Sequence, residues 1–252
     1  MSDRPRVIVR SDAWAELRRF TPARIALGRA GASLPTAEVL RFGLAHAQAR
    51  DAVHAALDAD ALERELLGMG HSVLRVRSAA LDRATYLVRP DLGRRLCEAS
   101  AASLAARTSA ASGLLWVAAD GLSATAVERH LPPLLREVEA LDPAWRGAPA
   151  VIATQGRVAL GDEVGERLGA EIVVVAIGER PGLSSPDSLG LYVTYAPRRG
   201  RTDAERNCIS NVRPAGLGYR AAANLLEEVV REARRRRLTG VAQVGGRPGL
   251  LP

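Results

Sequence analysis

The 252-residue chain is poor in several residue types, and each shortage excludes some classes of protein. It has two cysteines, Cys97 and Cys208, far apart in sequence, which argues against a disulfide-stapled fold and favours a reducing compartment. Aromatic residues make up 4% of the chain, too few for a base-stacking platform. The net charge of +7 includes a run of four arginines at 234–237, but without aromatic or zinc-knuckle spacing we expect no nucleic-acid partner.

Long apolar runs and metal-ligand patterns are also missing. The first ten residues hold three consecutive apolar residues, too few for a signal-peptide core, and the longest apolar runs elsewhere have the length of strands. We therefore expect an intracellular chain that does not cross a membrane. His46, Asp51 and His54 fall on one predicted helix, but no further ligand has suitable spacing, so we expect no metal site.

Strands alternate with amphipathic helices along most of the chain. Strands are predicted at 72–77, 85–88, 113–119, 148–154, 172–177 and 190–195. Helices are predicted at 35–57, at 60–67, from 90 to about 106, at 124–141 with an interruption near Pro132-Pro133, before Gly169 with Asp162 as its cap, and at 219–233. This order predicts an α/β fold, a Rossmann-like, mostly parallel sheet flanked by helices, preceded by an N-terminal helical segment.

Two turns follow predicted strands at their carboxyl ends, where open α/β sheets bind ligands. Asp120-Gly121-Leu122-Ser123 opens a helix, and its simplest interpretation is a tight turn with Ser123 as the N-cap. Gly178-Glu179-Arg180-Pro181-Gly182-Leu183 places a carboxylate after a buried strand, and both a salt-bridged loop and a ligand-binding turn fit it. Ser123, Ser210 and Cys208 lack the sequence context of a nucleophile.

Five motifs in one order resemble the small subunit of ethanolamine ammonia-lyase, over about residues 21–241. They are Ala23-Arg24-Ile25-Ala26-Leu27-Gly28-Arg29-Ala30-Gly31, His46-Ala47-Gln48-Ala49-Arg50-Asp51-Ala52-Val53, Arg89-Pro90-Asp91-Leu92-Gly93-Arg94-Arg95-Leu96, Asp120-Gly121-Leu122-Ser123, and the stretch from Gly156-Arg157-Val158 through the Glu179 turn to Cys208-Ile209-Ser210-Asn211. Several motifs in one order are far more specific than any one of them.

The resemblance implies a cofactor, a partner and a reaction. Members of that family pair with a large subunit, hold adenosylcobalamin between the two chains and support the radical conversion of ethanolamine to acetaldehyde and ammonia. The family's cofactor contacts fall on Val158, Glu179 and Cys208, with no catalytic or metal-ligating residue on this chain. Gly178, Arg180 and Asn211 are further candidates because they are neighbours in sequence.

The resemblance also suggests a division of labour along the chain. Residues 1–70, the helical segment, would contact the other subunit, and residues 71–252 would form the Rossmann-like domain that contacts cobalamin. None of the four histidines lies in an Asp-x-His-x-x-Gly motif, so we do not expect this chain to ligate cobalt.

Two questions stay open at the level of sequence. The segment before Ala23 is shorter than the extension that some relatives use for packaging in a bacterial microcompartment, so cytosolic residence and encapsulation are equally compatible with it. The alternative function is that of a non-catalytic α/β nucleotide-binding module, although Gly28-Arg29-Ala30-Gly31 lacks the spacing of known phosphate loops.

Overall fold

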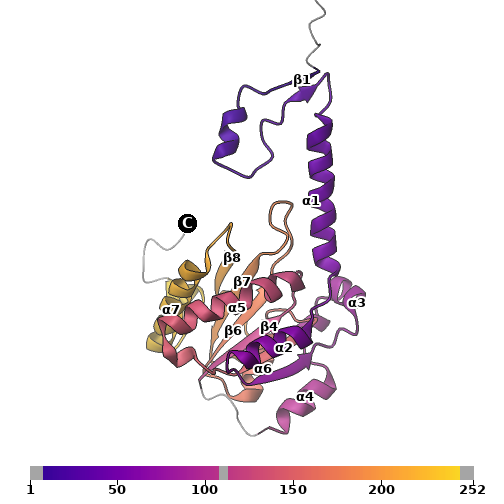
Figure 1. Ribbon diagram of the computed structural model, residues 1–252. Coiled ribbons are helices and arrows are strands. Elements are labelled where there is room, and N and C mark those ends of the chain that lie inside the picture. The colour runs from indigo at the N-terminus through magenta and orange to yellow at the C-terminus, as the bar shows by residue number, and fades with distance from the viewer. Residues whose placement is uncertain (1–7, 108–112, 245–252) are drawn as a thin grey trace, which may run out of the picture.

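The computed structural model describes residues 8–107 and 113–244 and has an α/β sheet domain at its centre (Figure 1). Six strands of the described chain form one sheet in the order β3-β5-β4-β6-β7-β8. The strands are β3 (Val73–Arg77), β4 (Leu114–Ala119), β5 (Ala150–Thr154), β6 (Ile172–Gly178), β7 (Leu189–Tyr195) and β8 (Asn207–Val212). The first four strands in this order are parallel, whereas β7 and β8 are antiparallel to their neighbours. The predicted fold class, a mostly parallel sheet, is confirmed.

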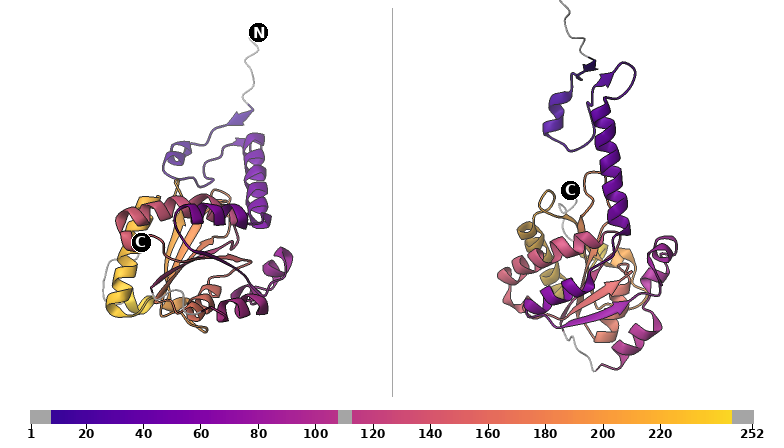
Figure 2. Two further views of the ribbon diagram at one scale, coloured as in Figure 1. Left: turned by 60° about the horizontal axis from the view of Figure 1, so that its bottom comes forward. Right: turned by 45° about the vertical axis from the view of Figure 1, so that its right-hand side comes forward.

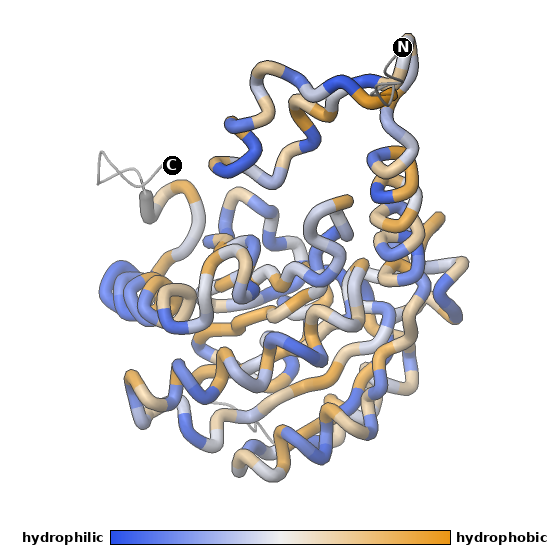
Figure 3. The backbone as a smooth tube through the Cα atoms, turned by 45° about the horizontal axis from the view of Figure 1, so that its top comes forward, coloured by the Kyte–Doolittle hydropathy of each residue, from blue (hydrophilic) through white to orange (hydrophobic). Residues whose placement is uncertain are grey.

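Helices cover both faces of this sheet (Figures 1 and 2). On one face lie α2 (Ala59–Gly68), α5 (Ala124–Leu141) and α7 (Tyr219–Arg236), and on the other lie α4 (Glu98–Ala105) and α6 (Leu160–Leu168). Successive residues of a strand point to opposite faces, so Trp116 of β4 packs with the first layer and Val117 with the second. Because both faces are covered, the central strands β4 and β6 are buried along their whole length, and orange, apolar stretches run through the middle of the domain in Figure 3.

An N-terminal arm extends away from the sheet domain (Figures 1 and 2). It consists of the two-stranded sheet of β1 (Val9–Arg10) and β2 (Arg29–Ala30), the 3₁₀ helix η1 (Ala15–Arg19) and the long helix α1 (Thr36–His54). The predicted apolar stripe of α1 faces solvent, and Leu40 and Leu44 are 68% and 60% exposed. In contrast, α2 buries Leu62 and Leu66 in the core of the sheet domain.

Three predictions of secondary structure between the sheet strands are wrong. Residues 85–88 form the end of helix α3 (Arg83–Val88), because the Asp82 side chain accepts a hydrogen bond from the N–H of Thr85 and caps a helical turn. The helix expected from Pro90 begins only at Glu98, after the short 3₁₀ helix η2 (Leu92–Arg94). Helix α5 runs without interruption through Pro132 and Pro133, since its buried leucines hold it against the sheet on both sides of the pair.

Two further details differ near α6 and the sheet edge. Asp162 is not the cap of α6: it lies inside the first turn, is fully buried, and forms an ion pair with Arg206. The end of α6 at Gly169, in the left-handed conformation, is confirmed. The edge strand β8 was not predicted, because its alternating pattern is short and polar. Within the described ranges, no helix has the length and apolarity needed to span a bilayer.

Candidate functional site

A cavity of about 270 Å³ opens at the carboxyl ends of the parallel strands, where the strand order reverses around β4. The connection from β4 to β5 crosses one face of the sheet, and the connection from β5 to β6 crosses the opposite face. The two connections therefore diverge and leave a crevice between them. The residues that line it come from α3, the turns after β4 and β5, the end of β6, and β7: Tyr86, Gly121, Leu122, Arg157, Val158, Ile177, Gly178, Glu179, Arg180 and Tyr192.

Two glycines let the turn after β4 pass close to the end of β6. The N–H of Leu122 donates to the carbonyl oxygen of Gly178 at 2.9 Å, and Gly121 has a φ of 55°. A Cβ on Gly178 would lie 2.0 Å from the carbonyl oxygen of Ser123, so no other residue fits there without movement. Ser123 occupies the N-cap position of α5, as expected, but its hydroxyl does not cap the helix and donates to the carbonyl oxygen of Pro186 at 3.0 Å instead.

The carboxylate of Asp120 fixes the turn that carries Val158. It is buried at the end of β4 and accepts hydrogen bonds from the N–H groups of Gln155 and Gly156 at 2.9 and 3.0 Å. Burial raises the pKa of Asp120, while these two backbone donors and the nearby Arg83 act in the opposite direction. The turn after β5 is therefore held to β4 by a buried polar group rather than by apolar contact alone.

Glu179 is half-buried in the cavity wall, and its carboxylate is oriented by the two antiparallel strands. The Ser188 hydroxyl donates to one carboxylate oxygen, and the backbone N–H of Asn211 donates to the same oxygen at 3.2 Å. The N–H of Glu179 in turn donates to the carbonyl oxygen of Ser188 at 2.9 Å. Asn211 has a φ of 60°, a left-handed conformation that Asn tolerates better than most residues. These contacts leave Glu179 held in one place, with further acceptor capacity on its oxygens.

Cys208 lies one strand away from the cavity wall. It is exposed on β8, directly opposite Tyr192 of β7 in the strand register, and its Sγ lies 3.2 Å from the Ser210 hydroxyl. Tyr192 itself lines the cavity, and burial raises its pKa, as do the Cys208 and Glu179 side chains to a smaller degree. Val158 and Glu179 thus share the cavity, and Tyr192 connects them to Cys208.

The further candidates Gly178 and Arg180 also line the cavity, and Asn211 reaches it through its hydrogen bond to Glu179. Sequence reasoning missed Tyr192 and Ser188, because their places depend on strand pairing: Tyr192 lies opposite Val175 of β6, and Ser188 contacts Glu179.

A stack of one aromatic ring and two arginines was also missed from sequence, and two of its members, Tyr86 and Arg157, line the cavity. The guanidinium groups of Arg83 and Arg157 lie 4.9 and 4.5 Å from the centre of the Tyr86 ring. The Tyr86 hydroxyl donates to the carbonyl oxygen of Gly156 at 3.0 Å, and burial raises its pKa. The assignment of 85–88 to a strand hid this stack, because a strand would have pointed Tyr86 elsewhere.

The cavity wall thus offers the held carboxylate of Glu179, the arginines Arg157 and Arg180, and apolar surface from Leu122, Val158 and Ile177. Such a mixture suits the binding of a large ligand with both apolar and amide-bearing parts.

Comparison with known proteins gives consistent results over nearly the whole chain. A family model described as ethanolamine ammonia-lyase light chain (EutC) matches residues 11–243. A protein of Ralstonia nicotianae is 59% identical over 238 residues, which cover 92% of this chain and 88% of the relative. A protein of Azotobacter vinelandii is 58% identical over 96% of this chain and 90% of its own length, and one of Pseudomonas syringae pv. tomato is 54% identical over 96% and 88%. All three carry the name ethanolamine ammonia-lyase small subunit.

Proposed function

Because the chain belongs to the family of ethanolamine ammonia-lyase small subunits, which act in ethanolamine catabolism as part of a carbon–nitrogen lyase, we propose that its strand-end cavity binds adenosylcobalamin together with a large subunit. The observation that carries this proposal is the convergence of Val158 and Glu179, both expected cofactor contacts, on the wall of one cavity at the strand-order reversal.

The residues of the cavity fit this cofactor. The periphery of adenosylcobalamin bears amide side chains, and the Glu179 carboxylate can accept hydrogen bonds from their N–H groups. Val158 supplies apolar surface in the same cavity. Tyr192 also lines the cavity and lies opposite Cys208 in the sheet, so it extends the contact surface as far as Cys208. When bound, adenosylcobalamin would supply the radical chemistry that converts ethanolamine to acetaldehyde and ammonia, while these residues bind and orient it.

The N-terminal arm fits the role of a subunit contact in this proposal. Its large apolar side chains, among them Trp14, Phe20 and Leu40, are exposed, and so much apolar surface on an extended arm is typical of a protein–protein interface. The Arg24 side chain donates to the carbonyl oxygen of Leu183 at 3.3 Å, so the arm touches the loop that follows Glu179. Within residues 1–70 the proposal assigns the arm to subunit contacts, because α2 packs in the core of the sheet domain. It assigns residues 71–252 to the cofactor, with the assembly in the cytoplasm, either free or inside a microcompartment.

Co-expression with the large subunit tests the proposal. The purified complex should release ammonia from ethanolamine only when adenosylcobalamin is present, and neither chain alone should do so. Activity that does not depend on this chain would contradict the proposal. Retention of the chain on a nucleotide resin, with no cobalamin bound to the complex, would favour the alternative nucleotide-binding function.

A further inference from the structure

The cavity contains the positively charged Arg157, for which the described part of the chain offers no ion-pair partner. Arg157 lines the cavity, and its Nε is buried without a hydrogen-bond partner among the described residues. Two carboxylates of the site have other partners: Glu179 accepts from Ser188 and Asn211, and Asp120 accepts from two backbone N–H groups and lies 3.8 Å from the Arg83 guanidinium. A buried cationic donor without an anionic partner is costly, so this arrangement favours an anion brought by a ligand.

The side chain of Arg157 is held in place before any ligand arrives. Its guanidinium stacks on Tyr86 at 4.5 Å, and its backbone N–H donates to the carbonyl oxygen of Gly93 at 2.8 Å. A Cβ on Gly93 would lie 2.9 Å from both the Arg157 Cγ and the Tyr86 ring, so this stack requires glycine at position 93. Because stacking fixes the planar group, less side-chain entropy is lost when it forms hydrogen bonds to a ligand.

A second arginine contributes to the positive charge of the cavity wall. The exposed Arg180 adds a second positive charge to the lining.

We propose that Arg157 forms a subsite for the phosphodiester of the cofactor's nucleotide arm. The inference rests on the proposed function. Adenosylcobalamin carries several neutral amides but a single anionic group, the phosphodiester that joins its corrin side chain to the nucleotide. The planar, stacked guanidinium presents paired N–H donors that match two phosphate oxygens. Glu179 and Arg157 then have separate tasks on the two sides of the cavity, recognising amides and phosphate respectively.

Binding of three related ligands to the complex of both subunits tests the subsite. Adenosylcobalamin and adenosylcobinamide methyl phosphate contain the phosphodiester, whereas adenosylcobinamide lacks it. We expect Arg157→Gln to weaken the binding of the first two ligands about tenfold or more, as the loss of a charge-assisted hydrogen bond does. The affinity for adenosylcobinamide should stay within about twofold of the wild-type value. Dissociation constants are measured by equilibrium dialysis, which does not depend on turnover.

Two further variants separate the subsite from folding and from general charge. Arg157→Lys keeps the charge but not the fork of donors, so its affinity for the two phosphodiester ligands should lie between those of wild type and Arg157→Gln. Arg231→Gln removes an equal charge from the exposed surface of α7, outside the cavity lining, and should bind all three ligands as wild type does.

An equal loss for all three ligands in Arg157→Gln would overturn the inference, because it would mean that Arg157 only supports the cavity. Unchanged binding of all three ligands would overturn it as well. So would weaker subunit association without a change in ligand preference, because Arg157 would then pair with a carboxylate of the partner subunit. If the wild-type complex binds none of the ligands, the proposed function itself fails, and the subsite with it.

Discussion

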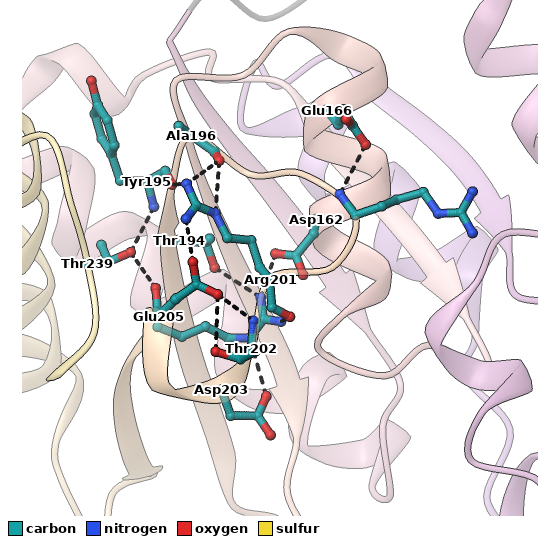
Figure 4. Close-up of polar contacts among 12 residues, drawn as sticks. Asp162, Glu166, Thr194, Tyr195, Ala196, Arg201, Thr202, Asp203, Glu205 and Thr239 are labelled. Atoms are coloured by element: carbon teal, nitrogen blue, oxygen red, sulfur yellow. Dashed lines mark hydrogen bonds and ion pairs between the residues drawn. The ribbon is translucent and has the colours of Figure 1, made fainter. Parts of the chain in front are cut away.

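Replacing Arg206 with methionine tests the buried polar network that joins α6 to the connection between β7 and β8 (Figure 4). Arg206 Nη1 lies 2.5 Å from Asp162 Oδ1, and the two side chains are 2% and 1% exposed. Arg206 also donates to the carbonyl oxygen of Arg201 at 2.8 Å and to the Thr194 hydroxyl at 3.3 Å. Because Arg206 precedes β8 by one residue, this network fixes the start of the strand that carries Cys208.

Methionine keeps much of the volume of arginine but leaves the Asp162 carboxylate buried without its cation. Removing one partner of a buried ion pair costs about 3–5 kcal/mol, and we expect Arg206→Met to lower the free energy of unfolding by an amount in this range. Adding Asp162→Asn should restore part of the loss, because the uncompensated charge is then gone.

The pH dependence of the variant has a definite sign. Burial already raises the pKa of Asp162 in the wild type, and Arg206 opposes that rise. Without Arg206 the folded-state pKa of Asp162 rises further above its unfolded value. A group with a raised folded-state pKa favours the folded state at low pH, so the deficit of Arg206→Met should shrink as the pH falls towards the unfolded pKa, about 4.

Urea unfolding of the variants is followed by far-UV circular dichroism and by the fluorescence of Trp116 and Trp145, which lie buried with ring centres 5.2 Å apart. A loss below about 1 kcal/mol for Arg206→Met would refute the reasoning, since that is the value of an exposed pair. So would a double variant no more stable than the single one.

Three further predictions concern the turn, the surface charges and the arm. Gly178→Ala, whose Cβ would meet the Ser123 carbonyl, should cost about 1–3 kcal/mol of unfolding free energy in urea, and wild-type stability would refute the close approach. The pKa of Glu205 is lowered to about 2, mainly by the Thr202 N–H and next by Arg201. Its contribution to folding stability is therefore present above pH 4.5 and lost as the pH falls to about 2. Between pH 5 and pH 2 the Tm of Glu205→Gln should therefore fall less than the Tm of wild type, and an equal fall in both proteins would contradict this. Leu40→Ser with Leu44→Ser should weaken assembly with the large subunit in analytical ultracentrifugation while leaving the circular dichroism spectrum unchanged, and unaltered assembly would exclude this face of α1 from the interface.

The sheet and the position of the cavity at its strand ends could be predicted from the sequence because buried parallel strands are continuous apolar runs. The run from Ile172 to Gly178 is buried at every position, and the Glu179 turn follows from where it ends. The short elements could not be predicted in this way. Residues 85–88 have strand-forming composition, yet a single hydrogen bond from Thr85 to the Asp82 side chain marks a helix there.

The partners of the site residues depend on tertiary contacts between distant parts of the chain. Glu179 is predicted from the sequence as a site residue, but its partners are not. Ser188 directly precedes β7 and Asn211 lies in β8, and the pairing of these strands is not encoded in any local pattern. Asp162 has the residue type and position of a cap, but burial against Arg206, which is 44 residues away, decides its role. Local propensity therefore predicts elements, whereas the polar contacts that shape the cavity require the fold.

The affinity of the two-subunit complex for adenosylcobalamin, compared between wild type and Glu179→Ala, tests the central claim most directly. The account predicts that the complex binds adenosylcobalamin and that Glu179→Ala weakens this binding by about tenfold while the urea unfolding midpoint stays close to wild type. Equal affinity in the two proteins would contradict the account, because the cavity formed around Glu179 would then not hold the cofactor.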